Sequence, residues 1–170
     1  VAGPVCGTGH NSGYEEAALP RPMIVNAESG NFDGAPANCF DEALDRQSQF
    51  PGRQRLEKMT SGQYLGELVR LAAGEAGVAL PDDWRAASLA PALGGKTDHD
   101  TATLVRAVTE RAGQLVAAEL AALVRRAVLA PGATPVVAAD GAVFARLPLF
   151  RQTVQAWLPV LAEQRARLQL

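Results

Sequence analysis

The stretch VAGPVCGTGHNSGYEE, residues 1–16, decides the class of the fold, because glycines interrupt its apolar residues as in strands joined by tight turns. A second apolar run at residues 23–25 follows the Pro20-Arg21-Pro22 segment. We therefore predict strands and turns over residues 1–26. A loop is expected over residues 29–37, where serine, glycine, asparagine and proline are frequent.

Apolar residues at three- and four-residue spacing predict helices in the following part of the chain. The predicted helices cover residues 40–47, 53–73, 97–129 and 147–165. The buried face of the second helix is expected to carry Leu65, Leu68, Val69 and Ala72. The third helix contains small residues that predict close approach by another element: Ala112, Gly113, Ala117 and Ala121. Pro159 is expected to kink the last helix.

The C-terminal part predicts a closing unit of strand, hairpin and helix. Residues 135–139 are predicted to form a buried strand, and Asp140-Gly141 a hairpin turn before the last helix. Residues 167–170 predict a further short strand. The predicted order begins with strands, continues mostly with helices and ends with this unit. This order indicates a helix-rich α/β domain.

Composition and charge exclude several classes of protein. The chain has 170 residues, 48% of them hydrophobic and 20% charged, which is typical of one folded domain. Its formal net charge of −2 provides no basic footprint for nucleic acid. No apolar run is long enough to span a membrane. Cys6 and Cys39 belong to no metal motif, and two isolated thiols favour a reducing, cytoplasmic setting.

Two features near the N-terminus could carry chemistry. The turn Gly7-Thr8-Gly9 could hold a phosphate through backbone N–H groups and the threonine hydroxyl, although an ordinary tight turn is the more frequent meaning of this pattern. Glu28 follows an apolar strand and precedes a glycine-containing loop, which is a common place for a ligand contact. A solvated strand end is the more frequent explanation for a glutamate at this position.

The remaining candidates are weaker on their own. Glu57 and Glu67 lie on a predicted helix, where a glutamate usually faces solvent beside a cation such as Lys58 or Arg70. The two histidines, at positions 10 and 99, have no metal-site spacing. These residues alone predict only an α/β domain with a possible anion-binding turn.

Three segments, in this order, resemble the hexokinase family. Residues 5–16, which begin Val5-Cys6-Gly7-Thr8-Gly9-His10-Asn11, are similar to its G-T-G-x-N block, and residues 23–32 are similar to its N-x-E-x-G-x-F block. Within the second block, Glu28-Ser29-Gly30-Asn31-Phe32 is more similar to bacterial than to animal members. Asp45 and then PGRQRLEKMTSGQYLGEL, residues 51–68, resemble a third, longer block. The likeness continues more weakly through residues 111–123 and 139–150, and it is poor over residues 74–98.

The resemblance implies a fold and a set of ligands. The fold would be part of the large domain of a ribonuclease-H-like, actin-like ATPase. The activity would be ATP-dependent phosphorylation of glucose or a related hexose to hexose 6-phosphate, a step of glycolysis. Asn11, Glu28 and Glu57 would bind the hexose, and Gln54 would support Glu57. Gly7 and Thr8 would hold ATP phosphates, and Mg²⁺ would bind mainly through those phosphates without a metal site of its own.

The same resemblance implies that residues 1–170 are a partial large domain. The N-terminal domain with the catalytic base and the final adenosine-binding motif would belong to the remainder of the same polypeptide. We therefore expect no catalytic residue in this chain and no transfer activity from it alone. A non-catalytic, hexokinase-like sugar-binding or structural domain stays open as the alternative, with an α/β domain that binds no ligand as the third possibility.

Overall fold

Five strands form one sheet in the computed structural model, which describes residues 2–16, 20–21, 23–126, 135–163 and 167–169. The strands are β1 (Ala2–Cys6), β2 (His10–Glu16), β3 (Met23–Asn26), β4 (Val136–Ala138) and β5 (Arg167–Gln169). Their order across the sheet is β3-β2-β1-β4-β5. β1, β2 and β3 pair antiparallel, while β4 lies parallel to both β1 and β5. The strands that were expected at both ends of the chain are confirmed.

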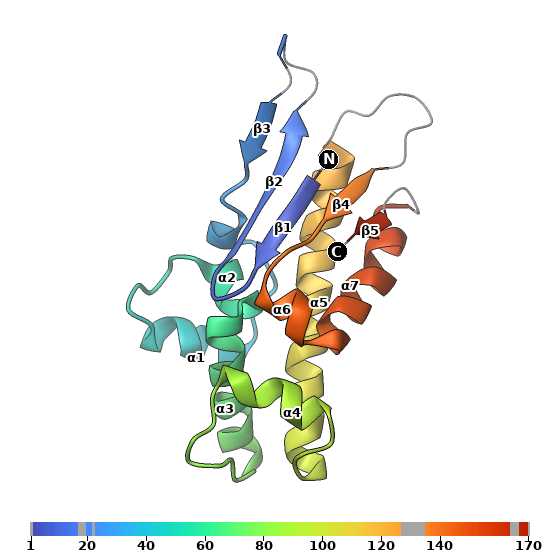
Figure 1. Cartoon of the computed structure of the whole chain (residues 1–170). Helices are drawn as coiled ribbons and strands as arrows, with labels where there is room; N and C mark the ends of the chain where they lie inside the picture. Colours follow the sequence, from blue (N-terminus) through green and yellow to red (C-terminus); the bar gives the residue numbers. More distant parts are fainter. Residues whose placement is uncertain (1, 17–19, 22, 127–134, 164–166, 170) are drawn as a thin grey trace.

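Helices occupy most of the chain between β3 and β5. They are η1 (Ser29–Asn31), α1 (Cys39–Gln47), α2 (Arg55–Thr60), α3 (Gly62–Ala76), η2 (Ala86–Ser88), α4 (Leu89–Leu93), α5 (His99–Arg126), α6 (Ala142–Arg146) and α7 (Pro148–Leu161). Figure 1 shows α5 and α7 side by side behind the sheet, with α1, α3 and α4 extending beyond one end of it. The expected α/β class is confirmed.

Small residues let α5 and α7 pack closely. A Cβ atom added at Gly113 would lie 2.8 Å from the Cβ of Thr153 on α7, which leaves no room for a side chain. Ala112, Ala117 and Ala121 are buried on the same helix. The prediction that another element approaches this part of α5 is therefore confirmed. Residues 127–129, which were expected to extend this helix, lie outside the described residues.

The single helix expected over residues 53–73 is wrong, because the chain breaks it at Ser61. This residue is extended, with φ −84° and ψ 152°, and it separates α2 from α3. Because of this break, the first N–H of α3 has no acceptor within the helix. This N–H, from Gly62, donates to the Gly7 carbonyl at 2.7 Å instead. The predicted apolar face of α3 is confirmed, since Leu65, Leu68, Val69 and Ala72 are all buried.

The hairpin expected at Asp140-Gly141 is also wrong. Asp140 forms a parallel bridge with Val5, and its carbonyl accepts a hydrogen bond from Cys6 N–H at 2.9 Å. The pair therefore extends β4 along β1 before the chain enters α6. Gly141 has φ 112°, and an added Cβ atom would lie 2.3 Å from the Cys6 carbonyl oxygen, so a glycine is required here.

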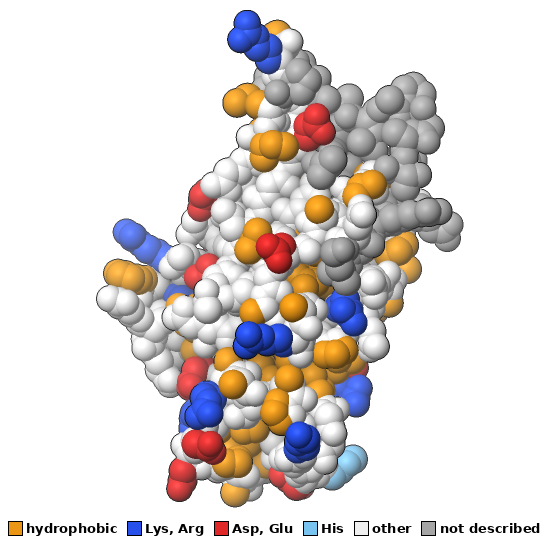
Figure 2. All heavy atoms as spheres, in the orientation of Figure 1, with side chains coloured by type: hydrophobic (Ala, Val, Ile, Leu, Met, Phe, Trp, Pro, Cys, Tyr) orange, Lys and Arg blue, Asp and Glu red, His pale blue; other side chains and the backbone are white. Residues whose placement is uncertain are grey.

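The sheet has one covered and one open face. Along β1, Ala2 and Cys6 are buried toward the helices, whereas Val5 is 56% exposed on the opposite face. Ile24 on the edge strand β3 is 69% exposed. Figure 2 shows the molecule from this open side, where Lys and Arg side chains are scattered and do not gather into one patch. No helix within the described residues combines the length and apolar character needed to cross a membrane.

Candidate functional site

Glu57 lies in the first turn of α2 and points toward the start of β2. Its Oε2 atom accepts a hydrogen bond from the backbone N–H of His10 at 2.9 Å. A Cβ atom added at Gly9 would lie 3.0 Å from the same oxygen, so the glycine turn and the carboxylate are in close contact. The neighbouring Lys58 is not its partner, because that ammonium is buried elsewhere. The interpretation of Glu57 as a solvent-facing helical glutamate is therefore wrong.

A chain of amide and carboxylate groups connects Asn11 to Glu28. Asn11 Nδ2 donates to Asn26 Oδ1 at 2.8 Å, and Asn26 Nδ2 donates to Glu28 Oε1 at 2.5 Å. Asn11 Oδ1 also accepts the backbone N–H of Ser29 at 3.2 Å. These bonds tie β2 to the loop after β3. Glu28 itself is exposed, so its carboxylate is accessible.

The short helix η1 brings the two acids to one place. Glu28 immediately precedes η1, and a Cβ atom added at Gly30 in η1 would lie 3.3 Å from Glu57 Cβ and 2.6 Å from the His10 carbonyl oxygen. Glu28 and Glu57 therefore border the same three-residue element, with Asn11 bonded to its first residue. The structure brings these three predicted hexose ligands together at the junction of β2, η1 and α2.

Two predicted ligands adopt left-handed backbone conformations. Glu28 has φ 48° and ψ 38°, and Gln54, at the start of α2, has φ 52° and ψ 43°. Non-glycine residues rarely adopt this conformation, and such strain concentrates at functional sites. Gln54 lies one turn before Glu57, as predicted, and its carbonyl accepts the Lys58 N–H at 3.0 Å.

The Gly7-Thr8 turn lies beside a separate pocket. Gly7 N–H donates to the Gly9 carbonyl at 2.9 Å, which closes the turn and leaves Thr8 exposed at its tip. The adjoining pocket has a volume of about 380 Å³, and its polar walls include Thr8, Gln63 and Arg146. The Gly62–Gly7 hydrogen bond connects this turn to the start of α3, which only Ser61 separates from the end of α2.

A buried cation that the sequence patterns did not identify anchors α2. Lys58 Nζ donates to Asp45 Oδ1 at 2.6 Å and to the Phe50 carbonyl at 2.7 Å. Burial by itself would raise the pKa of Asp45, but hydrogen bonds from Lys58 and the Gly52 N–H, with the charges of Lys58 and Arg55, lower it below its ordinary value. Neither Asp45 nor Lys58 lies in a local sequence pattern that predicts burial of its charge.

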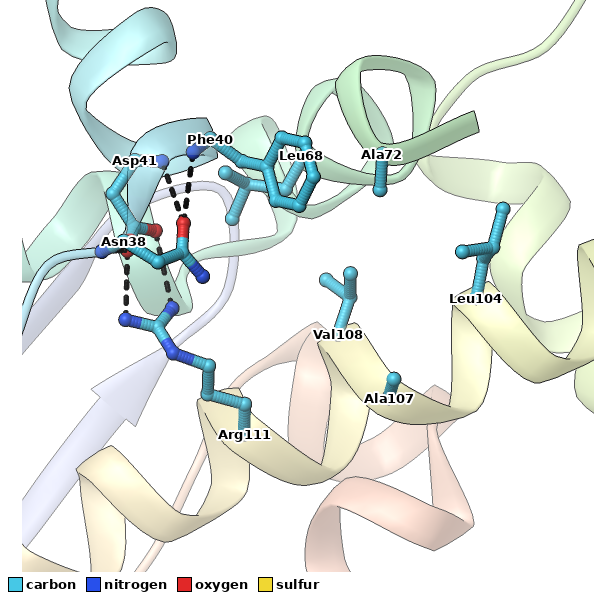
Figure 3. Close-up of a pocket in the computed structure, with 9 residues that line it drawn as sticks. All are labelled: Asn38, Phe40, Asp41, Leu68, Ala72, Leu104, Ala107, Val108 and Arg111. Carbon is cyan, nitrogen blue, oxygen red and sulfur yellow. Dashed lines mark hydrogen bonds and ion pairs between the residues drawn. The ribbon is translucent and has the colours of Figure 1, made fainter. Parts of the chain in front are cut away.

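Arg111 on α5 holds the loop that follows η1. It forms two hydrogen bonds with the Asp41 carboxylate, at 2.7 and 3.1 Å, and a third with the Pro36 carbonyl at 2.7 Å. Figure 3 shows this ion pair at one end of a small pocket whose other walls are mainly apolar. Asn38 caps α1 beside it, with its Oδ1 atom accepting the N–H groups of Phe40 and Asp41. None of the predicted hexose ligands lines this pocket.

His10 has a buried partner that sequence reasoning missed. Its Nε2 atom lies 2.6 Å from Glu119 Oε2, across a separation of 109 residues. No local spacing could have signalled this contact between β2 and α5. The remaining candidates behave as expected for surface residues, since Glu67 pairs with Arg70 at 3.3 Å and His99 is exposed. Within the described ranges, no group of three or more histidine, cysteine or acidic residues could hold a metal ion.

The family model and the similar sequences are all described as hexokinases. A family model described as hexokinase matches residues 1–76 and 95–170, leaving out most of the region where the resemblance was expected to be poor. A rice hexokinase, hexokinase-7 of Oryza sativa subsp. japonica, is 45% identical over 83 residues, which cover 41% of this chain and 18% of that protein. Hexokinase-1 of Saccharomyces cerevisiae is 54% identical over 54 residues, covering 29% of this chain and 11% of the yeast protein.

Solved structures give the same fold. A crystal structure of a hexokinase has a TM-score of 0.83 at 29% identity, over 99% of this chain and 46% of the other. A hexokinase from Schistosoma mansoni complexed with glucose has a TM-score of 0.80 at 23% identity, a likeness that concerns the fold alone. The chain spans less than half the length of these two structures.

Proposed function

The chain belongs to the hexokinase family, and from this premise we propose that it supplies the hexose site and part of the nucleotide site of an ATP-dependent hexose kinase. The proposed reaction transfers the terminal phosphoryl group of ATP to glucose or a related hexose, giving the hexose 6-phosphate. The enzyme would take part in glycolysis. Two free thiols, one buried and one exposed, support a reducing, cytoplasmic setting.

One observation carries the proposal. Asn11, Glu28 and Glu57 border a single short helix, which supports the proposal that one pyranose contacts all three side chains. A carboxylate accepts two or more hydroxyl hydrogen bonds, and each such charge-assisted bond contributes about 1.5–3 kcal/mol when sheltered from water. Asn11 can donate and accept, which suits a hydroxyl group. Gln54, one turn before Glu57, would support that carboxylate.

The nucleotide side of the proposal rests on the Gly7-Thr8 turn. The exposed Thr8 hydroxyl borders a pocket of about 380 Å³, and a hydroxyl and turn amides suit phosphate oxygens. Arg146 in the same wall adds a positive charge. Mg²⁺ would be carried by the ATP phosphates and would neutralise the charge that develops on the transferred group.

We propose that residues 1–170 are part of the large domain, and that the remainder of the polypeptide provides the N-terminal domain, the catalytic base and the final adenosine-binding motif. Phosphoryl transfer depends on positioning and electrostatic stabilisation. Loss of a general base alone costs about 10²–10⁴ in rate. The 170-residue segment should therefore show no turnover in a coupled assay with glucose and MgATP, whereas the complete polypeptide should.

The site assignment is tested in the complete polypeptide with Glu57→Gln, compared with Glu67→Gln on the exposed face of α3. Glu57→Gln should raise the KM for glucose about 10- to 100-fold, because one charge-assisted hydrogen bond is weakened. Glu67→Gln should leave both substrate KM values unchanged, since Glu67 is exposed and pairs with the exposed Arg70. Wild-type glucose affinity in Glu57→Gln would refute the assignment. Glucose binding without turnover by the complete polypeptide would favour the non-catalytic alternative.

A further inference from the structure

We propose that His10 and Glu119 form a buried positioning pair that holds the predicted hexose ligands in place. The inference rests on the proposed function, and it adds His10 and Glu119 to the residues on which sugar binding depends. His10 Nε2 and Glu119 Oε2 are 2.6 Å apart, and the side chains are 0% and 10% exposed, respectively. The His10 side chain is fully buried, and Glu119 lies in the wall of a pocket of about 460 Å³ beside Glu28 and Ser29. The pair would act through the backbone and side chains that contact it.

Glu119 is the centre of a polar cluster below the hexose site. The hydroxyl groups of Ser12 and Ser29 hydrogen-bond each other at 2.9 Å, and both serines help to lower the pKa of Glu119. Ser12 and His10 lie on β2, Ser29 begins η1, and Glu119 lies in the middle of α5. The contact between His10 and Glu119 therefore connects β2 to the long helix behind the sheet, and the Ser12–Ser29 hydrogen bond connects β2 to the short helix at the site.

Each predicted hexose ligand is attached to this cluster. The backbone N–H of His10 donates to Glu57 Oε2 at 2.9 Å. Asn11 lies between His10 and Ser12, and its Oδ1 atom accepts both the Ser12 N–H and the Ser29 N–H. Glu28 directly precedes Ser29 in the chain. A shift of His10 or Ser29 would consequently move all three ligands.

The electrostatics of the pair favour one arrangement of protons. Burial by itself would raise the pKa of Glu119, but the hydrogen bond and charge of His10, with the two serine hydroxyls, lower it below its ordinary value. The carboxylate is therefore ionised at neutral pH, and His10 presents an N–H group to it from Nε2. His10 Nδ1 and Glu119 Oε1 are buried and find no hydrogen-bond partner in the described part of the chain.

Unpartnered buried atoms indicate that stability alone does not explain the pair. A buried ion pair is often no more stable than apolar residues of the same volume, whereas removal of one partner is strongly destabilising. Two partnerless atoms weaken the contribution to stability further. The contact with Glu119 fixes the position of His10 relative to α5. The backbone N–H of His10 in turn fixes the position of the Glu57 carboxylate. Positioning is therefore the role that the geometry supports.

The test measures steady-state kinetics of the complete polypeptide with glucose and MgATP. Glu119→Gln and His10→Met keep side-chain size but remove, respectively, the ionised acceptor and the imidazole donor. Each should raise the KM for glucose about tenfold or more, because supporting partners of ligating groups typically contribute effects of this size. The KM for ATP should stay within about twofold. His10→Gln retains an N–H group near the position of Nε2 and should restore most of the glucose affinity.

Controls separate this proposal from the one it rests on. Glu110→Gln, on the exposed side of α5 where Glu110 faces Arg106 at 3.8 Å, should match the wild type in every parameter. If Glu57→Gln raises the KM for glucose while folded Glu119→Gln and His10→Met do not, positioning is refuted and the hexose site stands. If Glu57→Gln has no effect, the hexose site itself is wrong. Equal changes in both KM values, or loss of folding in both variants, would give the pair a structural role and also overturn the proposal.

Discussion

Gly30→Ala tests whether the hexose site lies at the junction of β2, η1 and α2. Gly30 is buried, and its φ is not positive, so alanine is permitted by the backbone itself. The obstacle is steric. An added Cβ atom would lie 2.6 Å from the His10 carbonyl oxygen and 3.3 Å from Glu57 Cβ.

The size of the effect follows from these distances. Ordinary contact begins near 3.4 Å, so the His10 carbonyl and Gly30 must separate by roughly 0.8 Å. Overpacking of this kind costs about 1–3 kcal/mol of stability. A displacement of binding groups approaching 1 Å can cost about 10²-fold in kcat/KM, so we expect a loss of about 10- to 100-fold for glucose. The KM for ATP should change much less.

The assay compares the complete polypeptide carrying Gly30→Ala with one carrying Gly74→Ala. Gly74 lies in α3, where an added Cβ atom would meet no neighbouring element within 4 Å, so its substitution is unhindered. Alanine should stabilise that helix by about 0.5–1 kcal/mol and leave glucose kinetics unchanged. The reasoning would be refuted by a Gly30→Ala enzyme with wild-type kcat/KM for glucose and an unchanged melting temperature.

Further predictions concern buried and titrating groups. Lys58→Met should lower the free energy of unfolding in urea by about 3–5 kcal/mol, because it leaves the Asp45 carboxylate buried without its ammonium; an unchanged urea midpoint would contradict this. A maleimide reagent should label Cys39 and spare Cys6 until denaturant is added, since burial raises the pKa of the Cys6 thiol; mass spectrometry of the native protein decides this. Asp98 should titrate at a pKa of about 2 by NMR, because backbone and side-chain hydrogen bonds at the start of α5 stabilise its ionised form. Its contribution to stability is therefore present above pH 3.8 and is lost as the pH falls toward 2; a midpoint near 3.8 would show that the hydrogen bond from Thr101 N–H does not stabilise the ionised carboxylate.

Local patterns were sufficient for most elements of the fold. The glycine-punctuated N-terminal strands and the apolar face of α3 were predicted correctly, because strand and helix periodicity depend on neighbouring residues. The small residues of α5 indicated close packing, and α7 contacts them through Thr153. Periodicity failed at Ser61, where a long-range hydrogen bond to Gly7 competes with continuation of the helix. It failed again at Asp140, where pairing with Val5 replaces the expected hairpin.

The site was only partly accessible from sequence. Asn11, Glu28 and Glu57 were named through a family resemblance, and their position along the chain alone had favoured a solvated surface for Glu57. The structure adds contacts between residues far apart in the sequence, which local sequence patterns do not reveal. Glu119 lies 109 residues from His10 and carries no motif, so only the folded chain identifies it.

The left-handed conformations of Glu28 and Gln54 set a limit on how this protein could be engineered for thermal resistance. Each disfavoured backbone costs about 1–2 kcal/mol, and glycine would remove most of that cost. A search for stabilising substitutions would consequently select glycine at both positions. The same exchange would delete a carboxylate and an amide from the proposed hexose site. On this proposal, sugar binding and thermal stability make opposite demands on the same two residues.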